Sequence, residues 1–120
     1  MRLHHVQMSC PAGGEPAARA FYGEALGLTE VPKPAVLAAR GGVWFRDPGV
    51  EVHVGVEVEF TRARKAHPAF AVADVDAVAQ RVQTAGFPVA WDGDLPGYRR
   101  FYTADGAGNR VEVLQSSVTA

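Results

Sequence analysis

The chain has 120 residues and a mass of 12.8 kDa, which suffices for one domain with a hydrophobic core but not for two independent enzyme domains. Hydrophobic residues make up 48% and charged residues 21% of the chain, and the formal net charge is -1. This ordinary globular composition provides no positive field for nucleic acid or an anionic membrane, and no apolar run reaches membrane-spanning length, so we expect neither partner.

The cysteine content predicts a reducing, cytoplasmic setting. Cys10 is the one cysteine and cannot form an intrachain disulfide, and no apolar run of signal-peptide length follows Met1. With nucleic acid and membranes excluded, the expected partner is a small-molecule substrate.

Hydrophobic spacing predicts a strand followed by a helix at the start of the chain. Residues 3–10 alternate, which places Val6 on one face of the strand and His5 on the other. A loop rich in Gly and Pro follows. Apolar residues then recur at helical spacing from Pro16 on, and Gly27 is expected to end that helix.

Three strands are expected in the rest of this half. Short strands are predicted over 28–31 and 42–46, and the turn signal of residues 47–49 ends the second of them. The alternation is clearest over 51–59, where four valines occupy one face and His53 lies on the other among glutamates.

A second half repeats this order of elements. A basic linker over 61–66 comes first, and Asp74 is predicted to cap a helix that Gly86 ends. The strands predicted in this half cover residues 67–72, 87–91, 98–103 and 110–115.

The two halves align as an internal repeat. Three pairs of positions show the offset: His5 and His67 are 62 residues apart, Gly27 and Gly86 are 59 apart, and His53 and Glu112 are 59 apart. Each half is a strand, a helix and three strands, and neither can bury a sheet face alone. We therefore predict one α+β domain over 1–120, made of βαβββ modules at about 1–60 and 66–116 that share a core or swap with a partner chain.

Four residues at repeat-equivalent positions form a candidate metal site: His5, His53, His67 and Glu112. All four lie on the strand faces opposite the branched or aromatic residues, so they converge if the sheet curls with that face inward. Imidazole and carboxylate ligands suit one divalent transition metal ion, namely Zn, Ni, Fe or Mn. The alternative is four unrelated polar residues on a solvated face. His4 shares its face with Val6, and we interpret it as structural.

Further side chains are candidate substrate contacts. A guanidinium can hold a carboxylate or phosphate in bidentate fashion, and aromatic side chains can line a pocket. The candidates are Gln7, Trp44, Arg100 and Tyr102, with Arg46 and Arg99 beside them. Surface charge and barrel packing are the alternative explanation, because the alternation does not say which face of 98–103 turns inward.

Three motifs resemble the vicinal oxygen chelate superfamily, which includes glyoxalase I, fosfomycin-resistance and bleomycin-resistance proteins, methylmalonyl-CoA epimerase and extradiol dioxygenases. They are FYGEALGL at 21–28, HPAFAVADVD at 67–76 and DGAGNRVEVLQ at 105–115, and the resemblance spans roughly residues 3–115. It implies tandem βαβββ modules whose curled mixed sheet forms an incomplete barrel around a metal, commonly within a homodimer.

The resemblance also assigns ligands by position. His5 and His67 match the histidines that open the two modules, Glu112 matches the closing carboxylate, and His53 sits where some members place Glu. One departure is Gly106, where the family usually has Pro, which should alter the turn but spare the ligand strand.

The number of ligands decides the expected chemistry. Four ligands leave an octahedral ion two adjacent positions for a substrate with neighbouring oxygens, which indicates a glyoxalase-like metal-dependent lyase or isomerase. By resemblance to the glyoxalases, Glu112 is then the catalytic residue that moves a proton. Three ligands, without His53, suit an extradiol-type dioxygenase or a fosfomycin-type resistance transferase. The third alternative is a metal-free, drug-binding protein similar to the bleomycin-resistance proteins.

Overall fold

A computed structural model describes residues 1–116 of the chain. In chain order its elements are β1 (Val6–Cys10), α1 (Glu15–Ala18), the π-helical η1 (Arg19–Ala25), β2 (Thr29–Val31), α2 (Ala35–Ala38), β3 (Val43–Asp47), β4 (Val50–Val56), β5 (Ala69–Ala71), α3 (Val75–Thr84), β6 (Ala90–Asp92), β7 (Tyr98–Ala104) and β8 (Arg110–Ser116). The last positions of the predicted domain, 117–120, lie outside the described residues.

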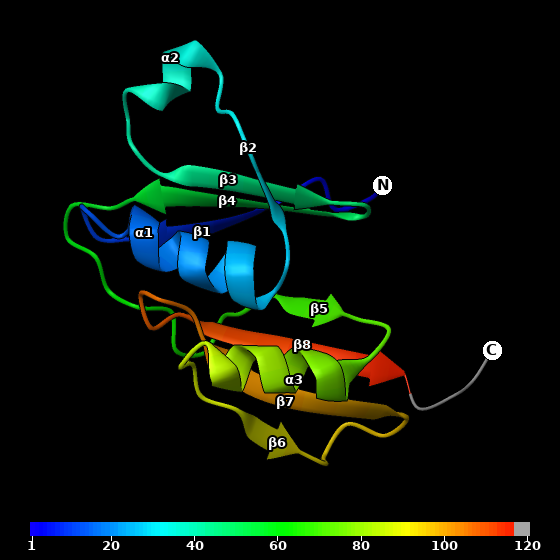
Figure 1. The fold of residues 1–120 in the computed structure, drawn as a ribbon. Coiled ribbons are helices and arrows are strands. Elements are labelled where there is room, and N and C mark those ends of the chain that lie inside the picture. Colours follow the sequence, from blue (N-terminus) through cyan, green and yellow to red (C-terminus); the bar gives the residue numbers. More distant parts are fainter. Residues whose placement is uncertain (117–120) are drawn as a thin grey trace.

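The strands form two four-stranded mixed sheets with the same topology (Figure 1). The first sheet has the order β1-β4-β3-β2 and the second sheet has the order β5-β8-β7-β6. In each, the opening strand pairs parallel with the last strand and the other pairings are antiparallel. The predicted α+β class with tandem βαβββ modules is confirmed, and the two sheets do not close into a barrel within one chain.

The strand register separates a core face from a ligand face in each sheet. In the first sheet His53 lies beside Gln7 of β1 and Trp44 of β3, so these three side chains share a face. Val52 and Val54 project from the other face into the core, at 0% and 2% exposure. The faces therefore follow the alternation of the sequence.

The strand predicted over 51–59 ends earlier than expected. β4 stops at Val56, and its last pairing contact is the bond from Glu57 N to Cys10 O. β1 ends at Cys10 and Pro11 follows without an N–H to donate, so the valine pattern continues with no neighbouring strand. Val58 is accordingly exposed.

Other boundaries also differ from the prediction. β1 starts at Val6 and β5 at Ala69, so both opening histidines precede their strands. The short helix α2 was not predicted. It lies in the connection of residues 32–42 between β2 and β3, which we call the arm, and it projects away from the second module (Figure 1).

α1, η1 and α3 cover the core faces of the sheets, and α1 and α3 lie on the same side of the molecule (Figure 1). The predicted N-cap of α3 is confirmed, because Asp74 Oδ1 accepts from Ala77 N at 3.1 Å. Phe21 of η1 meets Phe87 edge to face at 5.0 Å, which joins the two modules in one apolar core. Within the described residues no helix is long and apolar enough to cross a membrane.

A buried carboxylate also joins the modules. Asp105 Oδ2 accepts from the Tyr22 hydroxyl at 2.7 Å and from Asn109 Nδ2 at 3.1 Å, and Oδ1 accepts from the backbone of Ala107 and Asn109. Asn109 Nδ2 also donates to Ser9 O in β1 at 2.8 Å. Burial, followed by the charge of Asp105, raises the pKa of Tyr22 well above its usual value.

The turn before β8 packs directly against α1. A Cβ at Gly106 would lie 2.6 Å from both Cβ and O of Ala17, closer than side chains approach in proteins. This contact explains why the residue is Gly where the resembling family usually has Pro. β8, which carries Glu112, is intact as expected.

Tyr22→Phe tests the buried carboxylate. The variant removes a donor to Asp105 inside the core, so we expect the free energy of unfolding to fall by about 1 to 3 kcal/mol. Urea denaturation measures the change. Tyr98→Phe is the matched control because Tyr98 is 44% exposed, and equal midpoints for the two variants would contradict the prediction.

Gly106→Ala tests the contact with α1. The added methyl group must displace backbone of Ala17, and we expect a loss of about 1 to 3 kcal/mol in unfolding free energy. Gly93→Ala is the control, since a Cβ at Gly93 meets nothing within 4 Å. Thermal unfolding of both variants makes the comparison, and a Gly106→Ala protein as stable as the control would refute the steric argument.

Candidate functional site

The first pair of predicted ligands is His5, just before β1, and His53 of β4, and ring stacking holds the two together. The His53 ring stacks on Trp44 at 3.7 Å with an interplanar angle of 2°, and on His5 at 4.1 Å with an angle of 17°. These rings leave the His53 side chain 8% exposed, although it projects from the face opposite the core. Trp44 and His5 thus shield one candidate ligand from water.

A carboxylate fixes the orientation of His53. Glu51, two residues along β4, approaches His53 Nε2 with Oε2 at 2.7 Å, and Arg46 Nε donates to its Oε1 at 2.8 Å. The bond with His53, and after it the bond with Arg46, lowers the pKa of Glu51 to about 2. An ionised Glu51 can only accept, so Nε2 of His53 carries a proton, and Nδ1 is the ring nitrogen left to face a cation.

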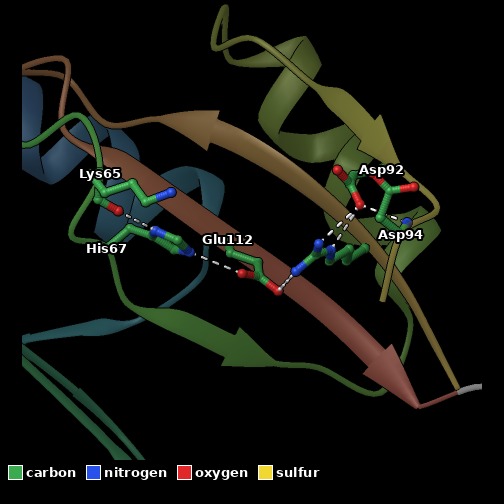
Figure 2. A network of polar contacts seen from close by, with 6 residues as sticks. Lys65, His67, Asp92, Asp94 and Glu112 are labelled. Carbon is green, nitrogen blue, oxygen red and sulfur yellow. Dashed lines mark hydrogen bonds and ion pairs between the residues drawn. The ribbon is translucent and has the colours of Figure 1, made fainter. Parts of the chain in front are cut away.

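The second pair of predicted ligands is His67, just before β5, and Glu112 of β8 (Figure 2). His67 Nδ1 lies 2.8 Å from Lys65 O, and because a carbonyl oxygen only accepts, Nδ1 carries the proton. His67 Nε2 points to Glu112 Oε1 at 3.0 Å. The Glu112 side chain is 6% exposed. The nitrogen and oxygen that face each other are thus the two atoms expected to bind a cation.

Arg100 holds the other oxygen of Glu112. Its Nη1 donates to Glu112 Oε2 at 3.1 Å, while Nε and Nη2 donate to Asp92 Oδ1 at 3.1 and 3.0 Å. Asp92 accepts from Asp94 N as well, and this bond first, followed by Arg100, lowers the pKa of Asp92. The guanidinium is therefore already occupied by two carboxylates.

The remaining predicted contacts divide between the two sheets. Tyr102 pairs with Glu112 across β7 and β8, so Tyr102 shares the face of Glu112, and its ring meets His67 edge to face at 5.4 Å. Gln7 is exposed on the first sheet, where its Nε2 donates to Met8 O at 3.3 Å. Arg99 points elsewhere, because it pairs with Asp76 of α3 and stacks over Trp91.

One chain brings the four predicted ligands together as two pairs, not as one set of four. No group of three or more His, Cys, Asp or Glu side chains within residues 1–116 is placed to hold a metal ion. Cavities of about 420 and 430 Å³ lie between the modules. His67 lines the first of them with Gln7, and His5 lines the second with Glu51.

The repeated βαβββ modules fall within residues that match a known family model. Residues 7–114 match the model of the glyoxalase-like domain. The chain belongs to the glyoxalase-like domain family. This family falls in the vicinal oxygen chelate superfamily, so the resemblance seen in the sequence motifs is confirmed.

Solved structures share the glyoxalase-like fold. A protein assigned to the glyoxalase family from Bacillus anthracis is 43% identical, with 98% of this chain and 100% of that chain covered and a TM-score of 0.90. The fosfomycin resistance protein FosX from Listeria monocytogenes is 16% identical over 98% and 95%, with a TM-score of 0.77. TnmS3, an antibiotic binding protein from Streptomyces sp. CB03234, is 24% identical over 98% and 99%, with a TM-score of 0.72. A search of curated proteins gave no significant match.

Three groups around this glyoxalase-like site were missed in the sequence. Glu51 shares the parity of His53 two residues away, which is a signal that could have singled it out. The Lys65 carbonyl and Asp92 have no such signal. They reach the site only through the linker and the pairing of β6 with β7.

Proposed function

We propose that this protein is a metal-dependent lyase or isomerase of glyoxalase type that works as a homodimer. One observation carries the proposal, the preset pair of His67 and Glu112. Lys65 O and Arg100 bind the far atoms of these side chains and leave Nε2 and Oε1 facing each other 3.0 Å apart. Such outer hydrogen bonds are typical of metal ligands.

The donor chemistry of both pairs fits a divalent transition metal. His67 Nε2, His53 Nδ1 and Glu112 Oε1 are the candidate donor atoms, of which Nε2 and Oε1 contact each other, and His5 adds a second imidazole beside the first sheet. Zinc, nickel, iron or manganese accepts such nitrogen and oxygen ligands. Whether His53 binds the ion or only supports His5 sets the number of open positions.

A homodimer is proposed because each chain holds its ligand pairs on separate sheets. A two-fold arrangement that sets the first sheet of one protomer against the second sheet of its partner makes two identical centres. Each centre combines His5 and His53 with His67 and Glu112 of the partner subunit.

The proposed reaction is proton transfer on a small substrate that has neighbouring oxygen atoms. A divalent ion held there supplies Lewis acidity that stabilises negative charge on the substrate oxygen. Glu112 moves the proton at the adjacent carbon, and Arg100 keeps that carboxylate oriented through Oε2. Trp44 and His5 keep water from the His53 ring, and Tyr102 provides an aromatic wall beside His67.

Metal-free binding of a small molecule is the second candidate. The observation in its favour is that Glu112 is bonded through both oxygens within the chain, to His67 and to Arg100. An antibiotic binding protein also has this fold. Retained affinity for the bound molecule after His67→Ala together with Glu112→Ala would favour this candidate over the enzyme. If His53 is not a ligand, oxygen uptake with catechols and metal-dependent drug modification distinguish the dioxygenase and transferase alternatives.

Metal content tests the leading proposal. Protein purified without chelator or affinity-tag metal should carry about one divalent ion per chain by mass spectrometry of the elements. The His67→Ala and Glu112→Ala variants should lose the ion, while a Glu24→Ala control, at an exposed residue of η1, keeps it. Absence of stoichiometric metal in the dimer, or retention in the double variant, would rule the proposal out.

Mixed dimers test where the centres lie. Chains with His53→Ala and chains with Glu112→Ala are each defective alone, but a dimer of one of each restores about one complete centre if centres form between chains. Recovery of metal binding and activity after subunit exchange supports the arrangement. If every centre lay within one chain, each would still lack a ligand and nothing would be recovered.

Arg100→Met tests the support of Glu112. Loss of this outer contact should weaken metal binding by about 10- to 100-fold. Arg99→Met is a matched control, since Arg99 is the neighbouring residue and bonds Asp76 on the other side of the sheet. A competition titration with a coloured chelator gives both affinities, and equal values would count against the role of Arg100.

A further inference from the structure

A third hollow lies beside the first ligand pair, between the first sheet and the arm. It has a volume of about 190 Å³, which is room for about six water molecules. From the sheet it is lined by Gln7, Trp44 and Gly55, and from the arm by Lys33 and Arg40. Leu37, Val54 and Val56 also line it, so it is a hollow of mixed character with two cations among apolar side chains and one aromatic wall.

The charge of this hollow is entirely positive. Lys33 and Arg40 are its ionisable lining residues, and within residues 1–116 neither forms an ion pair. The Lys33 ammonium donates to Gly41 O, which holds it on the arm. Glu15 accepts from Gly42 N at 3.0 Å and does not line the hollow. Glu15 lies outside the hollow and interacts with the charge of Lys33, which leaves the two lining cations with an excess of positive charge that favours an anionic ligand.

Comparison of the two modules shows that the hollow belongs to the first alone. The strands equivalent to β2 and β3 are joined by residues 93–97, which form no arm. Gly55 of β4 pairs with Ser9 of β1. The equivalent residue of β8 is Leu114, which pairs with Ala71 of β5. A Cβ at Gly55 would lie 2.5 Å from Gln7 Nε2, so glycine makes room for this amide.

Trp44 connects the hollow to the candidate metal ligands. One side chain both stacks on His53 at 3.7 Å and lines the hollow. A ligand group bound between Trp44 and Arg40 is thus separated from His53 by the indole. The hollow and the first candidate ligand pair thus share one side chain, Trp44.

We propose that the hollow is an oxyanion subsite, in which Lys33 and Arg40 bind a carboxylate, phosphate or phosphonate of the substrate. The Gln7 amide is the neutral donor beside them. The inference that the substrate is an acid, with its anionic group apart from its metal-chelating oxygens, rests on the proposed function. The subsite itself uses residues of the first module only.

Probe binding tests the subsite apart from the metal centre. The probes are phenylphosphonate, benzoate and neutral benzyl alcohol, titrated calorimetrically into the full-length dimer with EDTA at constant ionic strength. We expect at least one of the anions to bind and the alcohol not to bind. Arg40→Gln should weaken anion binding by about tenfold or more, because a charge-assisted hydrogen bond is lost. Arg64→Gln, an exposed arginine that does not line the hollow, should leave it unchanged.

Further variants distinguish the anion subsite from the proposed metal centre. The His67→Ala and Glu112→Ala double variant should bind the anion as the unaltered chain does, since its substitutions lie on the second sheet. Arg40→Glu should abolish anion binding while circular dichroism and metal content stay unchanged. Equal binding of the alcohol and the anions, or no effect of Arg40→Gln, overturns the subsite while leaving the metal proposal in place. Anion binding to a protein that takes up no metal supports the subsite and counts only against the proposed enzyme.

Discussion

The buried carboxylate of Asp105 is the interaction on which the arrangement of the two modules depends. It accepts the Tyr22 hydroxyl from η1 and the Asn109 amide from its own turn. Asn109 extends the contact to Ser9 O of β1 and, through Oδ1, to Ala63 N of the linker. A carboxylate buried at 6% exposure is stable only with such donors, so helix, turn, strand and linker are held in one geometry.

This geometry decides where the ligand pairs lie. The helices of both modules pack in the shared core, where Phe21 of η1 also meets Phe87, which follows α3. The face of each sheet that the helices cover is therefore buried within the chain. The opposite faces carry His53 in the first sheet and Glu112 in the second, and these two sheets do not close into one barrel. A second copy of the chain is the simplest complement, because identical chains supply the missing pair by symmetry.

The sequence predicted the features that depend on alternation and repetition. Strand parity placed His53 opposite Val52, and the repeat predicted the topology of both modules. Features that depend on neighbours were missed: β4 ends at Val56 because β1 ends, and Lys65 O reaches His67 only in the folded linker. Spacing along the chain does not encode such long-range contacts, and it left open whether the site closes within one chain.

The asymmetry between the modules bears on how a substrate would lie. On the second sheet Arg100 is bonded to Asp92 and Glu112, and Arg110 lies over the Tyr102 ring at 4.0 Å. Within residues 1–116, Lys33 and Arg40 on the arm form no ion pair. An anionic group entering the site is attracted less to Arg100 than to the cations of the arm, since an arginine already held by two carboxylates has little positive potential left for a third. In the proposed dimer, a substrate whose acid group is bound by Lys33 and Arg40 lies with that group beyond Trp44 and its neighbouring oxygens toward Glu112 of the partner subunit.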